Sequence, residues 1–280
     1  MRTRILTGAV ALLLFVPVLF LSHTVVFDAA IAFISLMGTV ELLKCVGVLG
    51  KYAISAPSVL VSFLVPLLFR YVQNEAIMLI AIAYLFFLLY AVVFARKEHS
   101  TNDIALCFFS AFFVTVSFTS IIITREHDYG DILYLMIFIG AWTTDTFAYF
   151  TGKLLGKHKL PLPIRDVSPN KTIEGVAGGV AFCALAFMLY GFIIAELNRF
   201  DAEPNYILLA AAGVATAVIS ILGDLSLSAI KRNYGVKDYG AVFPGHGGIL
   251  DRFDSVMAVA PVVMIISAIL LKFERYGLFM

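Results

Sequence analysis

Carboxylates, cations and glycines concentrate between Asp224 and Asp254, in a chain that is otherwise mostly apolar. Asp224, Ser228 and Lys231 recur at helical spacing along one stripe, and Asp251 and Asp254 share the start of the next apolar run. Mg²⁺ usually takes one or two carboxylates together with substrate phosphates, and neighbouring Lys and Arg side chains bind the phosphates themselves. The combination is what metal-assisted phosphoryl or nucleotidyl transfer needs.

A glycine-rich turn, PGHGG at residues 244–248, lies between these carboxylates. Glycines let backbone approach a ligand closely and offer N–H groups to phosphate oxygens. A lone histidine is more often structural, but the glycines on both sides of His246 favour a role in a ligand-binding loop.

Asp145 lies deep within an upstream apolar run, with Tyr149 and Lys153 at i+4 and i+8 on the same helical face. It is either a hydrogen-bonding partner in helix packing or part of a site. Intramembrane carboxylates are uncommon, which favours the functional interpretation.

The segment RDVSPNKTIEG, residues 165–175, has the pattern of a loop that opens a helix. Ser168 or Thr172 is the expected cap. Its side-chain and backbone donors suit an anion, although a basic loop that touches anionic lipid head groups fits equally well.

The composition indicates an integral membrane protein, because 61% of the 280 residues are hydrophobic and only 14% are charged. A soluble domain is roughly 45–50% apolar and about 25% charged. The predicted fold is all-α and polytopic, with apolar runs of about 20 residues as membrane spans. The first run is interpreted as a spanning helix and not as a cleaved signal peptide, since it lacks an A-x-A pattern. Nine spans are predicted, near residues 5–22, 24–43, 53–72, 76–95, 103–123, 131–152, 173–196, 205–229 and 255–272.

With nine spans, 15 of the 20 Lys and Arg residues fall on one side of the membrane. The positive-inside rule then places the N-terminus in the cytoplasm and the C-terminus outside. Both long polar loops, 153–172 and 230–254, become cytoplasmic. We divide the chain into N-terminal membrane helices, residues 1–125, and a catalytic membrane region, residues 126–280.

Two charged residues in the N-terminal spans receive no functional assignment. Glu41 lies three residues before Lys44 at a helix end, so a solvated or paired interfacial charge is expected. Asp28, near the outer end of its span, is interpreted in the same way. The three cysteines, Cys45, Cys107 and Cys183, are expected to be small buried hydrophobes.

The 27 residues from Ser228 to Asp254, SAIKRNYGVKDYGAVFPGHGGILDRFD, resemble the signature of the phosphatidate cytidylyltransferase family, also called CDP-diacylglycerol synthases. The resemblance covers S-x-x-K-R, K-D and P-x-H-G-G-x-x-D-R-x-D in order. The segments DTFAYFTGK and SPNKTIEG resemble motifs that flank the signature in this family. The first five spans match only as generic membrane helices.

The resemblance implies transfer of CMP from CTP to phosphatidic acid, which gives CDP-diacylglycerol and pyrophosphate. It implies Mg²⁺ as cofactor, with a second cation left open, and these metal-site residues: Asp224, Asp251, Asp145 and Asp254. The residues assigned to catalysis are Asp224, Asp251, Lys231, Lys237 and Arg252. The residues assigned to substrate binding are Ser168, Lys171, Thr172, Ser228, Arg232, His246, Gly247 and Gly248.

Two other functions fit parts of the pattern. A CTP-dependent polyprenol or dolichol kinase has the same physical needs, but the complete signature argues against it. An ion-coupled transporter also uses intramembrane carboxylates, but here the polar residues cluster in two loops and no inverted repeat is visible. The expected partners are CTP, phosphatidic acid and the bilayer, with no nucleic acid and with a homodimer as one option. The compact chain favours a bacterial inner membrane, with the active site on the cytoplasmic side.

Overall fold

The computed structural model describes residues 13, 15–197, 204–242 and 247–272, and within these residues the chain forms helices and no β-strand. The all-α prediction is therefore confirmed. Seven of the described helices are long and apolar enough to cross a membrane. They are α2 (Val25–Cys45), α4 (Asn74–Phe94), α5 (Thr101–Glu126), α6 (Gly130–Leu155), α8 (Ile173–Glu196), α9 (Tyr206–Asn233) and α10 (Leu250–Lys272).

Two further named helices are shorter. The apolar helix α3 (Tyr52–Leu68) has 17 residues, and α7 (Ile164–Val167) is a single turn. Eight of the nine predicted spans coincide with named helices; of the span 5–22 only residues 13 and 15–22 are described, and residues 15–20 are helical. The total of nine spans and the orientation of the termini stay predictions.

The chain divides into two compact units. The first unit comprises Met1–Ile122 and Asn233–Phe253, and the second comprises Ile123–Arg232 and Asp254–Met280. The first unit therefore combines the N-terminal helices with the segment 233–253, which sequence analysis grouped with the catalytic region.

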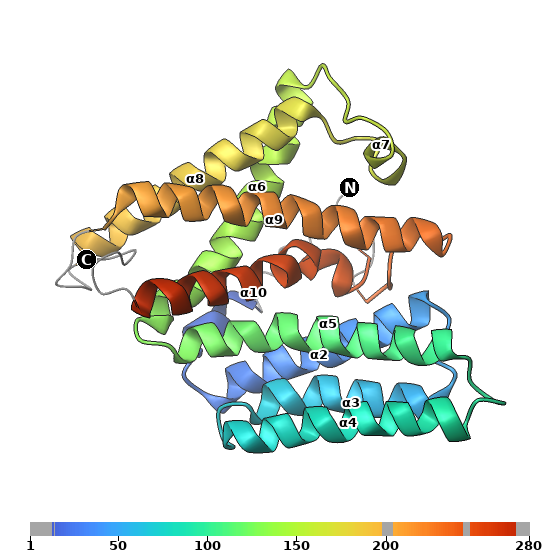
Figure 1. Ribbon diagram of the computed structural model, residues 1–280. Helices are drawn as coiled ribbons and strands as arrows, with labels where there is room; N and C mark the ends of the chain where they lie inside the picture. Colours follow the sequence, from blue (N-terminus) through green and yellow to red (C-terminus); the bar gives the residue numbers. More distant parts are fainter. Residues whose placement is uncertain (1–12, 14, 198–203, 243–246, 273–280) are drawn as a thin grey trace. The chain divides into compact units, whose positions relative to one another are not determined.

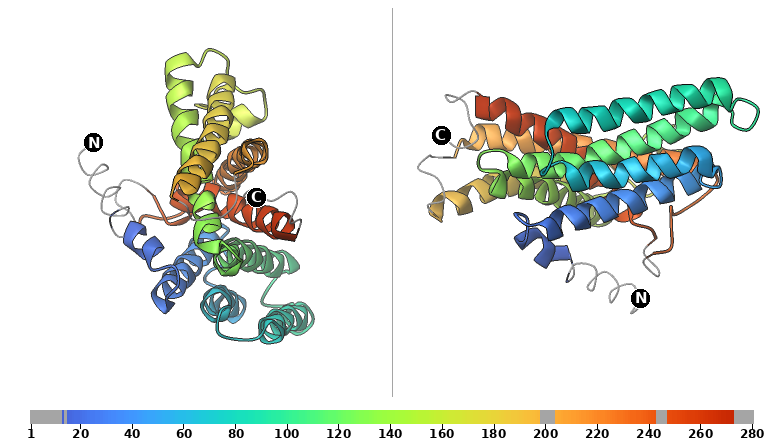
Figure 2. Two further views of the ribbon diagram at one scale, coloured as in Figure 1. Left: turned by 90° about the vertical axis from the view of Figure 1, so that its left-hand side faces the viewer. Right: turned by 90° about the horizontal axis from the view of Figure 1, so that it is seen from below.

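In the first unit, α2, α3, α4 and α5 run alongside one another as a bundle (Figures 1 and 2). Asp28 of α2 is fully buried and is paired with Arg70 at 3.3 Å, and the hydroxyl of Tyr71 donates to it at 2.7 Å. The expectation of a paired charge is confirmed for Asp28. These contacts tie the turn after α3 to α2, and α3 ends at Leu68, four residues earlier than predicted.

The second unit is built on a close pairing of α6 with α8, which Figure 1 shows in yellow-green and yellow. Small residues allow this approach, as is common between membrane helices. A Cβ atom added at Gly178 of α8 would collide with Thr151 of α6. The helices are also linked by a hydrogen bond from the hydroxyl of Tyr190 to the carbonyl of Ile132, at 2.9 Å.

None of the three cysteines, all of which lie in the described residues, forms a disulfide. Cys107 and Cys183 are buried and Cys45 is half-buried. The expectation of small buried side chains is therefore confirmed for Cys107 and Cys183, whereas Cys45 is only partly buried.

Candidate active site

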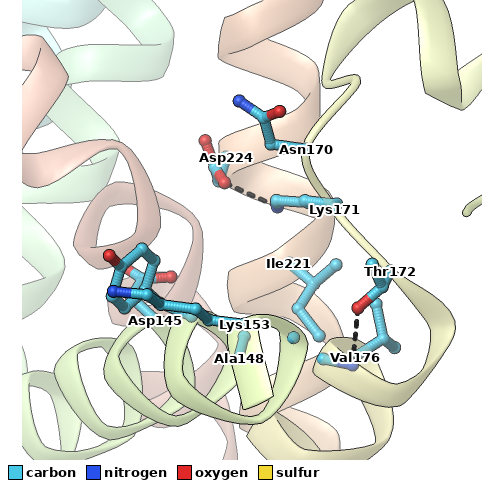
Figure 3. Close-up of a pocket in the computed structure, with 12 residues that line it drawn as sticks. Asp145, Ala148, Lys153, Asn170, Lys171, Thr172, Val176, Ile221 and Asp224 are labelled. Atoms are coloured by element: carbon cyan, nitrogen blue, oxygen red, sulfur yellow. Dashed lines mark hydrogen bonds and ion pairs between the residues drawn. The ribbon is translucent and has the colours of Figure 1, made fainter. Parts of the chain in front are cut away.

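The second unit contains a cavity of about 480 Å³ between α6, α9 and the segment that leads into α8 (Figure 3). Four residues that sequence analysis assigned to the site line it: Asp145, Lys171, Thr172 and Asp224. The cavity is also lined by residues without a prior assignment, namely Ala148, Tyr149, Gly152, Lys153, Asn170, Gly175, Val176 and Ile221. The structure thus brings three predicted segments to one place.

Asp224 of α9 has a donor at each carboxylate oxygen. The ammonium nitrogen of Lys171 lies 2.5 Å from Oδ2, and the Ser228 hydroxyl donates to Oδ1 at 3.4 Å. The Lys171 and Asp224 side chains are 23% and 26% exposed, so the pair is still reached by water. The predicted stripe of Asp224 and Ser228 is confirmed, and it gains a cation from the loop before α8.

Acidic side chains gather around this ion pair. The carboxyl group of Asp254, on α10, is repelled by Asp224 and Asp145 and attracted by Lys231. Lys231, in the last turn of α9, is only 8% exposed, so its charge acts inside the unit. Three of the four carboxylates assigned to a metal therefore share one electrostatic neighbourhood.

These residues fit a divalent cation. Among the described residues, no group of three His, Cys, Asp or Glu side chains is arranged to hold a metal ion by itself. Mg²⁺ does not need such a cage, because it usually combines one or two carboxylates with substrate phosphates and water. The ammonium group of Lys171 already occupies a cation position at Asp224.

The predicted face of α6 is confirmed, since Asp145, Tyr149 and Lys153 all line the cavity. The ammonium nitrogen of Lys153 lies 5.7 Å from the centre of the Tyr149 ring, within the range of a cation–π contact. Sequence analysis recognised this face but assigned only Asp145. The i, i+4, i+8 spacing was the signal for the other two residues.

The segment before α8 positions Lys171. Thr172 is the N-cap of α8, and its hydroxyl accepts a hydrogen bond from the Gly175 N–H at 3.1 Å. The predicted cap is therefore confirmed at Thr172. Ser168 contributes its carbonyl, which accepts from the Lys171 N–H at 3.3 Å. Roles of Ser168 and Thr172 in CTP binding stay predictions.

The signature residues Asn233–Phe253 belong to the first unit, whereas Asp254 belongs to the second. Asp251 is buried at the start of α10, and its Oδ2 accepts hydrogen bonds from the backbone N–H groups of Tyr239, at 2.8 Å, and Gly248, at 2.9 Å. The backbone thus fixes the orientation of Asp251, as outer-shell partners do for metal ligands. His246 lies outside the described residues.

Other predicted cations and glycines are placed as follows. Lys237 and Arg252 are exposed in the first unit, and Arg232 is exposed at the end of α9. Gly247 lies next to Asp251, since a Cβ added to it would be 2.7 Å from Asp251 Oδ2. The assignments of these residues to phosphates, and of Asp251 to the metal, stay predictions.

Sequence analysis missed one buried carboxylate. We expected Glu41 of α2 to be a solvated or paired interfacial charge; the side chain is only 4% exposed, so the solvated alternative is wrong. Its two oxygens accept hydrogen bonds from the backbone N–H groups of Ile249, at 3.0 Å, and Leu250, at 2.9 Å. A glutamate inside a predicted apolar span was the available signal.

Comparison with known proteins gives the class of the molecule. Residues 2–270 match the cytidylyltransferase family. The chain therefore belongs to the cytidylyltransferase family.

Curated relatives narrow this class. Proteins named phosphatidate cytidylyltransferase from Staphylococcus haemolyticus and Staphylococcus aureus are 37% and 38% identical over 270 residues. A third, from Staphylococcus saprophyticus, is 37% identical over 276 residues. Each of the three alignments covers 95% of this chain and 98% of the relative.

The family recognised from the signature is thus confirmed, and the chain is a nucleotidyltransferase enzyme of phospholipid biosynthesis, as predicted. The kinase and transporter alternatives lose their support. The apolar helices make the chain a membrane protein, and its bacterial relatives point to the plasma membrane.

Proposed function

We propose that the chain transfers CMP from CTP to phosphatidic acid and releases CDP-diacylglycerol and pyrophosphate. The observation that carries the proposal is the similarity to phosphatidate cytidylyltransferases along 95% of the chain. The cavity in the second unit supports it, because it combines carboxylates with the cations Lys153 and Lys171.

In this reaction a phosphate oxygen of phosphatidic acid attacks the α-phosphorus of CTP. A new P–O bond forms, the bond from the α-phosphorus to the bridging oxygen breaks, and pyrophosphate leaves with the electron pair. The attacking oxygen is already anionic near neutral pH, so no strong general base is required. The main task of the protein is to bring two polyanions together and to align them.

Asp224, with Asp254 and Asp145 nearby, would hold Mg²⁺. When bound, this ion supplies positive charge that neutralises and orients phosphate oxygens. Lys171 neutralises Asp224 in the free enzyme, and we propose that it turns to the triphosphate when the nucleotide arrives. Ser228 keeps the Asp224 carboxylate oriented throughout.

We further propose that the reaction takes place at the cytoplasmic face of the membrane. The support is the distribution of charge, with 15 of the 20 Lys and Arg residues on one side of a nine-span chain. CTP then arrives from water while the acyl chains of phosphatidic acid stay in the hydrocarbon. The homodimer considered from the sequence stays a prediction.

The direct test is incorporation of label from CTP into lipid by the purified protein, with phosphatidic acid and with or without Mg²⁺. Label at the α-phosphate should enter the lipid, and label at the γ-phosphate should leave as pyrophosphate. Lipid labelled only from the γ-phosphate would identify a kinase and refute the proposal.

Single substitutions test the assigned carboxylates. Asp224→Asn should lower turnover about 10²-fold or more, the loss typical of removing one preorganised electrostatic contact. Glu75→Gln is the control, because Glu75 is exposed in the first turn of α4. Turnover near wild type in both Asp224→Asn and Asp251→Asn would rule out the metal assignment.

A further inference from the structure

Glu41 is a charged side chain buried in a helix that is long and apolar enough to span the membrane. A carboxylate taken out of water is costly unless strong donors replace the lost hydration. Glu41 finds them in the N–H groups of Ile249 and Leu250, which lie 208 and 209 residues further along the chain. These groups begin α10, where the first N–H groups have no partner within the helix. A side chain of α2 therefore caps α10.

The loop before α10 approaches this carboxylate with backbone alone. A Cβ atom added at Gly240 or Gly248 would collide with the carboxylate of Glu41. Glycine at these two positions lets the backbone pass close to the Glu41 carboxylate.

The same loop is also held by Asp251, which accepts hydrogen bonds from the N–H groups of Tyr239 and Gly248. Two buried carboxylates, one from α2 and one from α10, thus bind four backbone N–H groups of the segment from Tyr239 to Leu250. Asp251 is the residue with a proposed catalytic role, and Glu41 fixes the backbone on which it is carried.

We infer that Glu41 is a positioning residue for cytidylyl transfer: it holds the backbone at Gly240 and at Gly248–Asp251 in its working conformation. This inference rests on the proposed function. A carboxylate suits the task because both of its oxygens accept. A glutamine would turn an amide NH₂ group toward one of the two backbone N–H donors, so one hydrogen bond would be replaced by two opposed donors.

The test compares Glu41→Gln with wild type and with the exposed control Glu75→Gln. For Glu41→Gln we expect kcat to fall about 10–100-fold, as for outer-shell partners of metal sites. The Mg²⁺ concentration for half-maximal rate should rise, while the KM for CTP stays near wild type. Trypsin should also cut faster after Lys237, an exposed residue close to the held segment. Glu75→Gln should match wild type in all of these.

Wild-type kcat, Mg²⁺ dependence and cleavage rate in Glu41→Gln would overturn the inference. The inference would also be overturned if the activity fell only in proportion to the amount of folded protein and the folded fraction had a normal Mg²⁺ dependence. If Glu41→Gln does not fold, Gly240→Ala perturbs the same contact through the added Cβ, and wild-type kcat and cleavage there would overturn the inference. A wild-type protein that transfers no label would instead refute the proposed function, and the cleavage rates would still report on Glu41.

Discussion

Replacing Lys171 by methionine should change the binding of the metal and of the nucleotide in opposite directions. In the free enzyme the Lys171 ammonium lies 2.5 Å from Asp224 Oδ2 and competes with a divalent cation for that carboxylate. In the nucleotide complex the same ammonium is proposed to contact the triphosphate. Lys171→Met should therefore strengthen metal binding to the free enzyme and weaken the binding of CTP.

The size of each effect follows from the exposure of the pair. With side chains 23% and 26% exposed, the ion pair is partly screened by water, so we take about 1 kcal/mol, the upper end for surface pairs. Its removal should tighten metal binding about 5-fold, at 1.4 kcal/mol for each factor of ten. A hydrogen bond to a charged group contributes about 1.5–3 kcal/mol, so the KM for CTP should rise about 10–140-fold.

Titration of the nucleotide-free protein with Mn²⁺, followed by electron paramagnetic resonance, measures the affinity for the metal. Initial rates give the KM for CTP. Lys157→Met is the matched control, because Lys157 is exposed in the loop after α6 and does not line the cavity. It removes the same charge and should leave Mn²⁺ binding unchanged. Unchanged or weaker Mn²⁺ binding in Lys171→Met would refute the competition between the lysine and the metal.

Two further substitutions test the framework around the site. Asp28→Asn removes the carboxylate charge that is paired with the mostly buried Arg70 and should lower the free energy of unfolding by about 3–5 kcal/mol. Tyr71→Phe removes only one hydrogen bond to Asp28 and should lower it by about 1 kcal/mol. Equal melting temperatures of the two variants in detergent would contradict the buried pair. Thr172→Ala removes the hydrogen-bond acceptor of the Gly175 N–H; it should lower the free energy of unfolding by about 1 kcal/mol and raise the KM for CTP by loosening the turn that carries Lys171. Thr172→Ser keeps the hydroxyl and should have wild-type stability and a wild-type KM. A serine variant as impaired as the alanine variant would rule out the cap as the cause.

The helices and the local side-chain spacings were predictable from the sequence. An apolar run needs only its length and hydropathy to identify a membrane helix. Contacts within one helix follow from its period, which is why the pairing of Asp224 with Ser228 and the cavity face of Asp145 were recognised. The Thr172 cap likewise depends on residues three positions apart.

Contacts between residues far apart in the chain were harder to predict from the sequence. Lys171 and Asp224 were both assigned to the site, but their direct pairing depends on how the loop before α8 meets α9. Helical spacing cannot supply that information, because the two residues lie on different elements. Residue type alone identified Lys171 and Asp224 as site residues, but it did not predict that their side chains form an ion pair.

Glu41 shows the limit most clearly. Its nearest charged neighbour in sequence is Lys44, which favoured an interfacial charge, whereas its partners are the backbone N–H groups of Ile249 and Leu250. Backbone donors are the same at almost every residue, so the partner positions contain no side-chain signature that sequence reasoning could detect. The same contact explains why α10 begins at Leu250, five residues before the predicted span at 255. The carboxylate from α2 satisfies N–H groups at the start of α10, and the helix can therefore begin among polar residues.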